Sequence, residues 1–134
     1  MKYLLDTNPC IRYLSGRSDA LRHRVDAVGD ADIVLCSVVL AELYFGAAKS
    51  HSPQATLRLQ QEFVSRFRSL AFDDTAARIY GPIRAELERS GAMIGANDLL
   101  IAAIAIANGL TVVTHNIDEF RRIPSLPIED WEAA

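Results

Sequence analysis

The stretch YLLDTNPCIRYL, residues 3–14, places a strand and a helix directly after one another. Its first residues, Tyr3–Leu5, form a short apolar run that is typical of a buried strand. Asn8 and Pro9 are a favourable N-cap and first-turn pair, so we expect a helix from there to about Leu14, ended by Gly16. A strand that passes straight into a helix is the repeating unit of a parallel sheet.

The alternation of strand and helix continues outward from this stretch to the end of the chain. Strands are predicted at residues 33–36 and 111–113, with weaker candidates at 69–72 and 127–129. Helices are predicted at residues 38–48, 54–67, 74–90 and 97–108. The sequence therefore predicts an α/β fold, a three-layer sandwich whose central, mostly parallel sheet of about five strands has helices on both faces.

Two of the predicted helices have unusual sequences. The pair Gly81-Pro82 lies inside the helix predicted at 74–90, where proline removes a backbone hydrogen bond, so we expect a kink or a break there. The segment 97–108 is apolar on nearly every face, which indicates a helix buried at the centre of the domain.

Composition restricts the class of protein. The chain has 134 residues, of which 50% are hydrophobic and 23% charged, and no linker interrupts it, so we expect one domain over residues 1–134. Its net charge of -3 argues against a protein that coats nucleic acid or membranes by charge alone. No apolar run is long enough for a signal peptide or a membrane span. With Cys10 and Cys36 both set among apolar residues as buried thiols, we expect a cytoplasmic protein without membrane contacts.

Three carboxylates fall where a ligand site is expected. Asp6 follows the first strand, Glu42 lies inside an apolar helical segment, and Asp98 begins the buried helix. Each alone has an ordinary explanation as a cap, a loop residue or compensation of a helix dipole, but all three lie near the carboxyl edge of the sheet, where α/β proteins bind ligands. Two carboxylates about 4 Å apart repel by roughly 4 kcal/mol, so a cation is needed. Oxygen ligands without histidine or cysteine favour Mg²⁺ or Mn²⁺.

The segment THNIDEF, residues 114–120, follows the third strong strand and reaches the same edge. Asn116 either completes a metal site or caps a short helix, and the residues alone leave both readings open. His115 has no second histidine at metal-binding spacing, so we interpret it as a surface residue.

Five motifs in this order resemble the PIN-domain family of ribonucleases, and within it the VapC-type toxins of bacterial toxin–antitoxin pairs. They are LDTN (5–8), AELYFGA (41–47), IGANDLLIAA (94–103), Thr114-x-Asn116 followed by Phe120, and LPIEDW (126–131). Together they span nearly the whole chain.

The resemblance implies a PIN-like nuclease domain and a metal-dependent endoribonuclease that uses Mg²⁺, with Mn²⁺ as a substitute, and serves as the toxin of such a pair. It implies Asp6, Glu42 and Asp98 as metal ligands and catalytic residues. Asn116 would occupy a fourth catalytic position, where many relatives carry aspartate. It also implies RNA as substrate, a homodimer, and a VapB-like antitoxin that fills the acidic groove.

Other residues are assigned supporting roles. Thr7 and Asn116 would position the metal site by hydrogen bonds, and Asp118 or Glu119 would supply the charge that asparagine lacks. Further supporting candidates are Asn8 and Asn97. Candidates for contacts with the RNA backbone are Arg12, Arg121 and Arg122.

Two alternatives remain open at this point. One is a catalytically inactive PIN-like module that binds RNA or protein. The other is a different Mg²⁺ enzyme on a doubly wound sheet, such as a small phosphatase or a phosphoryl-transfer receiver. The absence of any lysine after Lys49 argues against a receiver, and the absence of a Gly-rich loop argues against a nucleotide switch.

Overall fold

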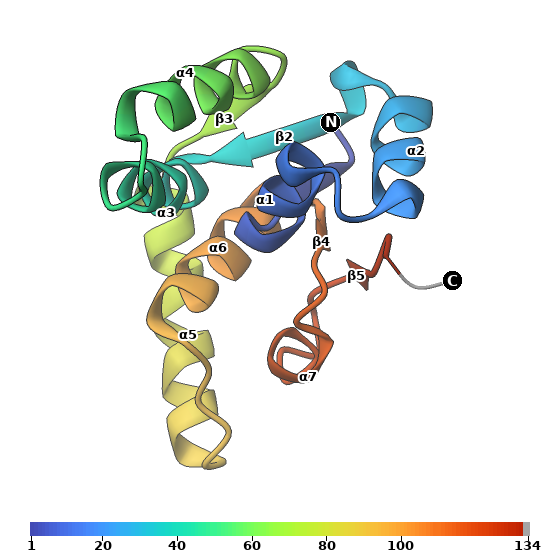
Figure 1. Cartoon of the computed structure of the whole chain (residues 1–134). Helices are drawn as coiled ribbons and strands as arrows, with labels where there is room; N and C mark the ends of the chain where they lie inside the picture. Colours follow the sequence, from blue (N-terminus) through green and yellow to red (C-terminus); the bar gives the residue numbers. More distant parts are fainter. Residues whose placement is uncertain (133–134) are drawn as a thin grey trace.

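A five-stranded sheet forms the centre of the molecule (Figure 1). The structure, a computed structural model, describes residues 1–132; residues 133 and 134 of the domain expected over 1–134 lie outside this part. The strand order is β3-β2-β1-β4-β5, and each neighbouring pair is parallel. The strands are β1 (Tyr3–Leu5), β2 (Ile33–Cys36), β3 (Arg68–Leu70), β4 (Thr111–Val113) and β5 (Ile128–Glu129). The predicted α/β fold is confirmed.

Helices connect successive strands. They are α1 (Thr7–Ser15), α2 (Asp19–Val28), α3 (Ser37–Ala48), α4 (Pro53–Val64), α5 (Asp74–Arg89), α6 (Ala96–Ala107) and α7 (Ile117–Phe120), with a 3-10 turn, η1, at Asp30–Asp32. Because crossovers between parallel strands are right-handed, the helices before β3 cover one face of the sheet and those after it cover the other. The contacts agree, since α1 packs against α2, α3 and α4, whereas α5 packs against α6.

The start of α1 differs from the sequence prediction. Its N-cap is Asp6 rather than Asn8, and the Asp6 carboxylate accepts the backbone N–H of Thr7. Pro9 consequently lies within the first turn, where its missing N–H is not needed by the helix. The end is as predicted, because Gly16 adopts a left-handed conformation with φ 70°.

Three other predictions need correction. The segment 19–28 was assigned no element but forms α2, whose N-cap Ser18 accepts the backbone N–H of Leu21. The expected break at Pro82 is absent, and α5 is continuous, since Pro82 lies on the exposed side, where water can bond the freed carbonyl. The bounds of one helix and one strand also differ from the prediction. The helix predicted at 54–67 is α4, which ends at Val64, and the strand predicted at 69–72 is β3, which begins at Arg68.

The core lies between the sheet and its helices. All four residues of β2 are buried, and half of the residues of α6, all of them apolar, are buried as its apolar sequence predicts. Cys10 and Cys36 are buried and not joined in a disulfide. Burial raises the pKa of the Cys36 thiol to about 11, so it stays protonated at neutral pH.

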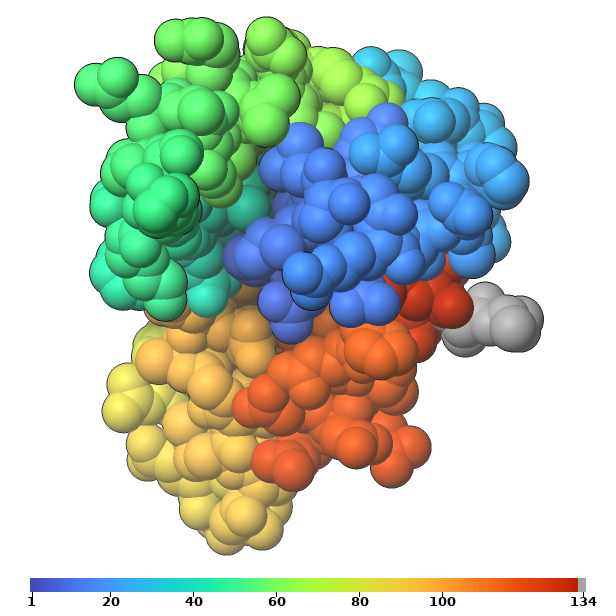
Figure 2. All heavy atoms as spheres, in the orientation of Figure 1, coloured from blue at the N-terminus to red at the C-terminus, as the bar shows by residue number. Residues whose placement is uncertain are grey.

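The order in which strands are added to the sheet reverses at β1, so that β2 and β4 lie on opposite sides of it. From β1 the chain proceeds outward to β2 and β3, and it then returns to β4 on the other side of β1. Such a switch point opens a crevice at the carboxyl ends of the two strands. Figure 2 shows the consequence on the surface, where the N-terminal residues, in blue, lie against the orange and red residues of the last third of the chain. No helix in the described part has the length and apolar character to cross a membrane.

Candidate active site

Asp6 lies at the switch point and is almost completely buried, with 3% of its surface exposed. The backbone N–H of Thr7 donates to its Oδ1 at 2.8 Å, and the hydroxyl of Thr114 donates to its Oδ2 at 2.9 Å. Because Thr114 follows β4 directly, these two bonds fix the carboxylate between the ends of β1 and β4.

Glu42 reaches the same crevice from the middle of α3. Its carboxylate accepts a short hydrogen bond from the Thr7 hydroxyl and a longer one, at 3.4 Å, from the Asn97 side-chain amide. Val39, Leu43 and Ala47 form the buried side of α3, whereas Glu42 itself is only half-buried. Thr7 therefore links Asp6, through its backbone, to Glu42, through its side chain.

Asp98 and Glu119 are joined by an asparagine. Asp98 lies half-buried in the first turn of α6, and Glu119 lies in α7. The side-chain amide of Asn116 donates to Asp98 Oδ2 at 3.2 Å and also to a carboxylate oxygen of Glu119. The backbone N–H of Gly95 donates to the other Glu119 oxygen at 2.8 Å.

The four carboxylates perturb one another. Burial, followed by the charges of Asp6, Glu119 and Glu42, raises the pKa of Asp98 to about 7. Burial also raises the pKa of Asp6, against the lowering effect of its hydrogen bonds from Thr7 and Thr114. Hydrogen bonds from Asn116 and Gly95 lower the pKa of Glu119, so that Glu119 holds the negative charge while Asp98 tends to hold a proton.

This arrangement fits a divalent cation. Within residues 1–132, none of the four carboxylates forms an ion pair with a basic side chain. Gly95 leaves space over them, since a Cβ at that position would lie 3.5 Å from Asp98 Oδ2 and 3.7 Å from Glu119 Oε1. In the described part, however, no three of these carboxylates have ligand atoms that all lie within 4.8 Å of one another, as expected for like charges without a cation between them.

The structure places the remaining candidates outside this cluster. Asn8 is exposed and lines a separate hollow with Arg12, and the exposed Asp118 pairs with Arg121 at 3.4 Å. Arg122 donates to the backbone carbonyl of Met93 at 2.9 Å. Of the two acids suggested to replace the missing charge, the structure therefore brings Glu119 to the cluster and not Asp118.

An apolar groove of about 480 Å³ borders the acidic cluster. Thr7, Glu42 and Asn97 form its polar end, and Ile11 and Phe45 line it with 47% and 65% of their surfaces exposed. Few large apolar side chains are this exposed, which is typical of a surface that contacts a partner.

Sequence reasoning missed two features around the site. Thr114 was quoted only as part of a motif, yet its hydroxyl is the direct partner of Asp6. His115 was interpreted as a surface residue and is indeed exposed, but it lies beside Asp130 and Glu132. No local pattern predicts the second grouping, because α7 and β5 lie between His115 and the two acids in the chain.

Comparison with known proteins agrees with this fold. Residues 3–126 match the PIN domain family. The chain is 41% identical, over 98% of both chains, to the tRNA(fMet)-specific endonuclease VapC of Salmonella typhimurium. It is 40% identical to ribonuclease VapC2 of Rickettsia felis, over 98% of this chain and 99% of that protein. A crystal structure of DNA-bound VapBC from Salmonella typhimurium superimposes with a TM-score of 0.92, at 41% identity over 98% of each chain.

A parallel α/β sheet with acidic residues at its switch point is thus the architecture of a PIN-domain protein, and the chain belongs to this family. Within it, the chain is a full-length homologue of the VapC ribonuclease toxins. The predicted resemblance is confirmed.

Proposed function

We propose that the chain is an endoribonuclease dependent on Mg²⁺ or Mn²⁺ and acts as the toxin of a toxin–antitoxin pair. The observation that carries the proposal is the group of Asp6, Glu42, Asp98 and Glu119, which converge on one crevice without a basic partner in the described residues. A catalytically inactive binding module would not need to retain these acids together, where burial first and then the neighbouring charges raise the pKa of Asp98 to about 7.

In the proposed mechanism, Asp6, Glu42 and Asp98 hold the metal ion, and Glu119 adds the charge that Asn116 lacks. When bound, the ion activates a water molecule and neutralises charge on the phosphate during hydrolysis. Thr7 and Thr114 fix Glu42 and Asp6 by hydrogen bonds, as outer partners of metal ligands do. Without metal the pKa of Asp98 is about 7, so binding of the ion near neutral pH would displace a proton from this carboxylate.

RNA is the proposed substrate, and its phosphates need basic contacts near the acids. Arg12 lines a hollow together with Asn8 and Arg17, beside the start of α1, and remains our candidate for a backbone contact. Arg121 and Arg122 are each held by a partner within the chain, as Arg12 is by Glu132.

The proposed partner is a VapB-like antitoxin. An apolar segment of the antitoxin would pack on Ile11 and Phe45, and a basic side chain would reach Glu42 at the polar end of the same groove. We further propose that the chain is one domain over residues 1–134 and forms a homodimer. Light scattering of the purified toxin tests the dimer, since a mass near that of one 14.8 kDa chain would contradict it.

Cleavage of total cellular RNA by the purified protein tests the enzymatic proposal. We expect discrete fragments with Mg²⁺ or Mn²⁺, none with chelator, and none from Asp98→Asn. Asp118→Asn is the matched control, because it removes a carboxylate outside the cluster and should cleave as the unchanged protein does. If Asp98→Asn cleaves normally, the site is wrong; if the folded protein binds RNA without cleaving it, the chain is a binding module.

A further inference from the structure

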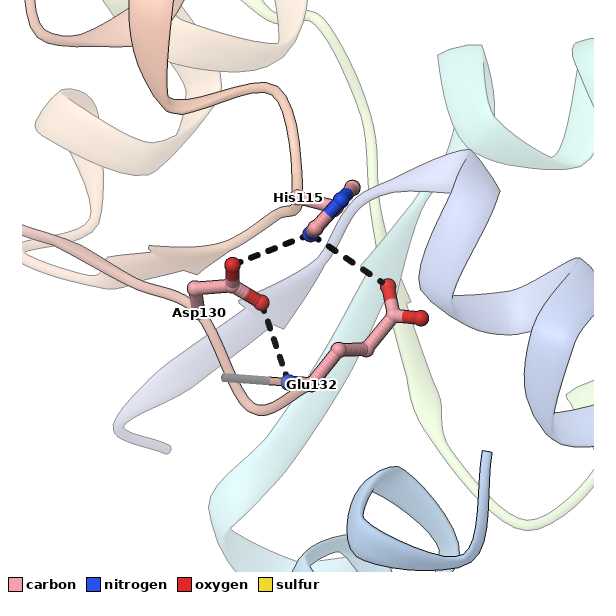
Figure 3. Close-up of side chains that lie close together, drawn as sticks. All are labelled: His115, Asp130 and Glu132. Carbon is pink, nitrogen blue, oxygen red and sulfur yellow. Dashed lines mark hydrogen bonds and ion pairs between the residues drawn. The ribbon is translucent and has the colours of Figure 1, made fainter. Parts of the chain in front are cut away.

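His115 and its neighbours in the chain face opposite directions. Thr114 and Asn116 turn toward the acidic cluster, where they contact Asp6 and Asp98. The His115 ring instead points toward the segment after β5, and Figure 3 shows it facing the carboxylates of Asp130 and Glu132. A second group of charged side chains thus lies behind the loop that carries Asn116.

The three side chains direct one atom each to a common point. His115 Nδ1 lies 3.0 Å from Asp130 Oδ2 and 4.0 Å from Glu132 Oε2. In the described part of the chain, this is the one group of three possible metal ligands whose atoms all lie within 4.8 Å of one another. Ligands bound tetrahedrally at 2.0–2.1 Å are separated by about 3.3 Å, between the two distances measured from Nδ1.

Glu132 supplies an independent indication of a ligand. Its side chain is only 7% exposed, and its Oε1 is paired with the Arg12 guanidinium. Its Oε2 is buried, and nothing within residues 1–132 forms a hydrogen bond with it. A buried carboxylate oxygen without a partner is unfavourable, and this one is directed at His115, where a cation would satisfy it.

Asp130 is held in position in a similar way. Its Oδ1 accepts the backbone N–H of Glu132 at 2.9 Å, which leaves Oδ2 free to face the His115 ring. Each carboxylate therefore has one oxygen fixed by the protein and the other available. The His115 side chain is 65% exposed, so a fourth coordination position would open to solvent.

Protonation of His115 alone does not account for the group. The single hydrogen on Nδ1 serves Asp130 at 3.0 Å, and Glu132 Oε2 at 4.0 Å is beyond hydrogen-bond distance. A metal ion would contact all three atoms at once if Glu132 Oε2 moved from 4.0 Å to about 3.3 Å from Nδ1, the separation of tetrahedral ligands.

We propose that His115, Asp130 and Glu132 form a second metal site, separate from the acidic cluster, for a divalent transition metal ion of the Zn²⁺ type. Imidazole with carboxylates suits such ions, whereas the oxygen-only cluster suits Mg²⁺. The ion ties the segment after β5 to the loop between β4 and α7, and Arg12 is the outer partner that orients Glu132. The proposal is independent of the ribonuclease activity.

Calorimetric titration with Zn²⁺ alone tests this site in the full chain carrying Asp98→Asn, which weakens the acidic cluster. We expect one equivalent of Zn²⁺ to bind and to raise the melting temperature. Loss of a residue that only orients a metal ligand weakens binding about 10–100-fold. Because His115 is itself a ligand in this proposal, His115→Ala added to Asp98→Asn should weaken Zn²⁺ binding by more than this. Adding His51→Ala, which removes an exposed histidine elsewhere, should leave binding unchanged.

A spectroscopic measurement identifies the ligands without reference to stability. Co²⁺ in place of Zn²⁺ should give the intense visible absorption of a tetrahedral site, and His115→Ala or Asp130→Asn should abolish it. The proposal would be overturned if the His115→Ala variant bound Zn²⁺ as strongly as the protein that keeps His115. It would also be overturned by Zn²⁺ binding that Asp98→Asn alone removes, since the ion would then occupy the acidic cluster.

Discussion

The Thr114 hydroxyl donates a hydrogen bond to Asp6 Oδ2 at 2.9 Å, between residues that are 108 positions apart in the chain. The same hydroxyl oxygen accepts the backbone N–H of Asn116 at 2.9 Å. One side chain thus joins the end of β1 to the loop after β4, and it sets the distance between Asp6 and the residues that hold Asp98.

Thr114→Val is expected to damage both stability and activity. Valine fills the same buried space but leaves the Asp6 carboxylate and the Asn116 N–H without this partner, which costs about 1–3 kcal/mol of unfolding free energy. RNA cleavage should fall about 10–100-fold, as for other outer partners of metal ligands. Denaturant unfolding and cleavage rates measure the two effects. Thr111→Val, at the start of the same strand, should change neither; equal effects of both substitutions would contradict the role of Thr114.

The raised pKa of Asp98 predicts the pH dependence of the metal-free protein. Between its ordinary value of 3.8 and its folded value of about 7, Asp98 binds a proton in the folded state and releases it on unfolding. Its contribution to unfolding free energy therefore falls as pH rises through this range and levels off above about 7. The melting temperature without metal should fall from about pH 5.5 to about pH 8, and Asp98→Asn should flatten the slope. An unchanged slope would contradict the shift.

Mg²⁺ should reverse this trend, because it binds the ionised form of Asp98. At a hundred times its Kd the ion adds about 2.7 kcal/mol to the unfolding free energy. The increase in melting temperature caused by Mg²⁺ should therefore be larger at about pH 8 than at about pH 5.5. Thermal melts over a Mg²⁺ titration at both values measure it, and an increase that is independent of pH would count against Asp98 as a ligand.

Glu119→Gln tests whether this residue supplies the charge that Asn116 lacks. Glutamine keeps an oxygen for the Gly95 N–H but removes a negative charge, so Mg²⁺ affinity should fall about 10-fold or more. Because the fold lowers the pKa of Glu119 and so stabilises its charged form, we expect the metal-free variant to gain no stability. Asp118→Asn is the matched control. It alters one exposed ion pair with Arg121, and we expect unchanged affinity and a change in stability within about 0.5 kcal/mol. Calorimetry with Mg²⁺ would contradict the assignment if both variants bound alike.

Phe45→Ala should weaken binding of the cognate antitoxin while sparing the fold. The ring lines the groove beside Glu42 with 65% of its surface exposed, so its removal leaves no cavity in the core. A buried aromatic anchor at an interface is worth about 2 kcal/mol or more, which is roughly a 30-fold loss of affinity. Leu59→Ala, on α4 with 61% exposed, controls for loss of a surface apolar residue. Equal affinities of the two variants would place the antitoxin elsewhere.

Much of the fold followed from local sequence. The strands at Tyr3–Leu5, Ile33–Cys36 and Thr111–Val113 were predicted at their observed bounds, because short apolar runs between helix signals admit few other readings. The helix at Asp19–Val28 was missed although Ser18 and the spacing of Leu21 and Val25 mark it, since its exposed face is strongly polar. The N-cap was misplaced because Asn8-Pro9 is as good a local signal as Asp6.

The candidate site was predictable only in part. Asp6 and Asp98 were found because they follow and begin elements at one edge of the sheet, and Glu42 because it is an isolated carboxylate inside an apolar helical segment. The choice between Asp118 and Glu119 could not be predicted from the sequence, since it depends on which face of α7 turns inward. Contacts such as Thr114 with Asp6, or His115 with Glu132, depend on strand order and on a segment beyond β5, which no local pattern encodes.

The reversal of strand order at β1 also determines when the four acids come together during synthesis. Asp6 leaves the ribosome first, but β4 inserts beside β1 only after the whole β3–α5–α6 crossover has been made, and Glu119 follows later still. A nascent chain that ends before Glu119 therefore holds an incomplete set of acids. Translation must therefore proceed past Glu119 before Asp6, Glu42, Asp98 and Glu119 lie together in one crevice.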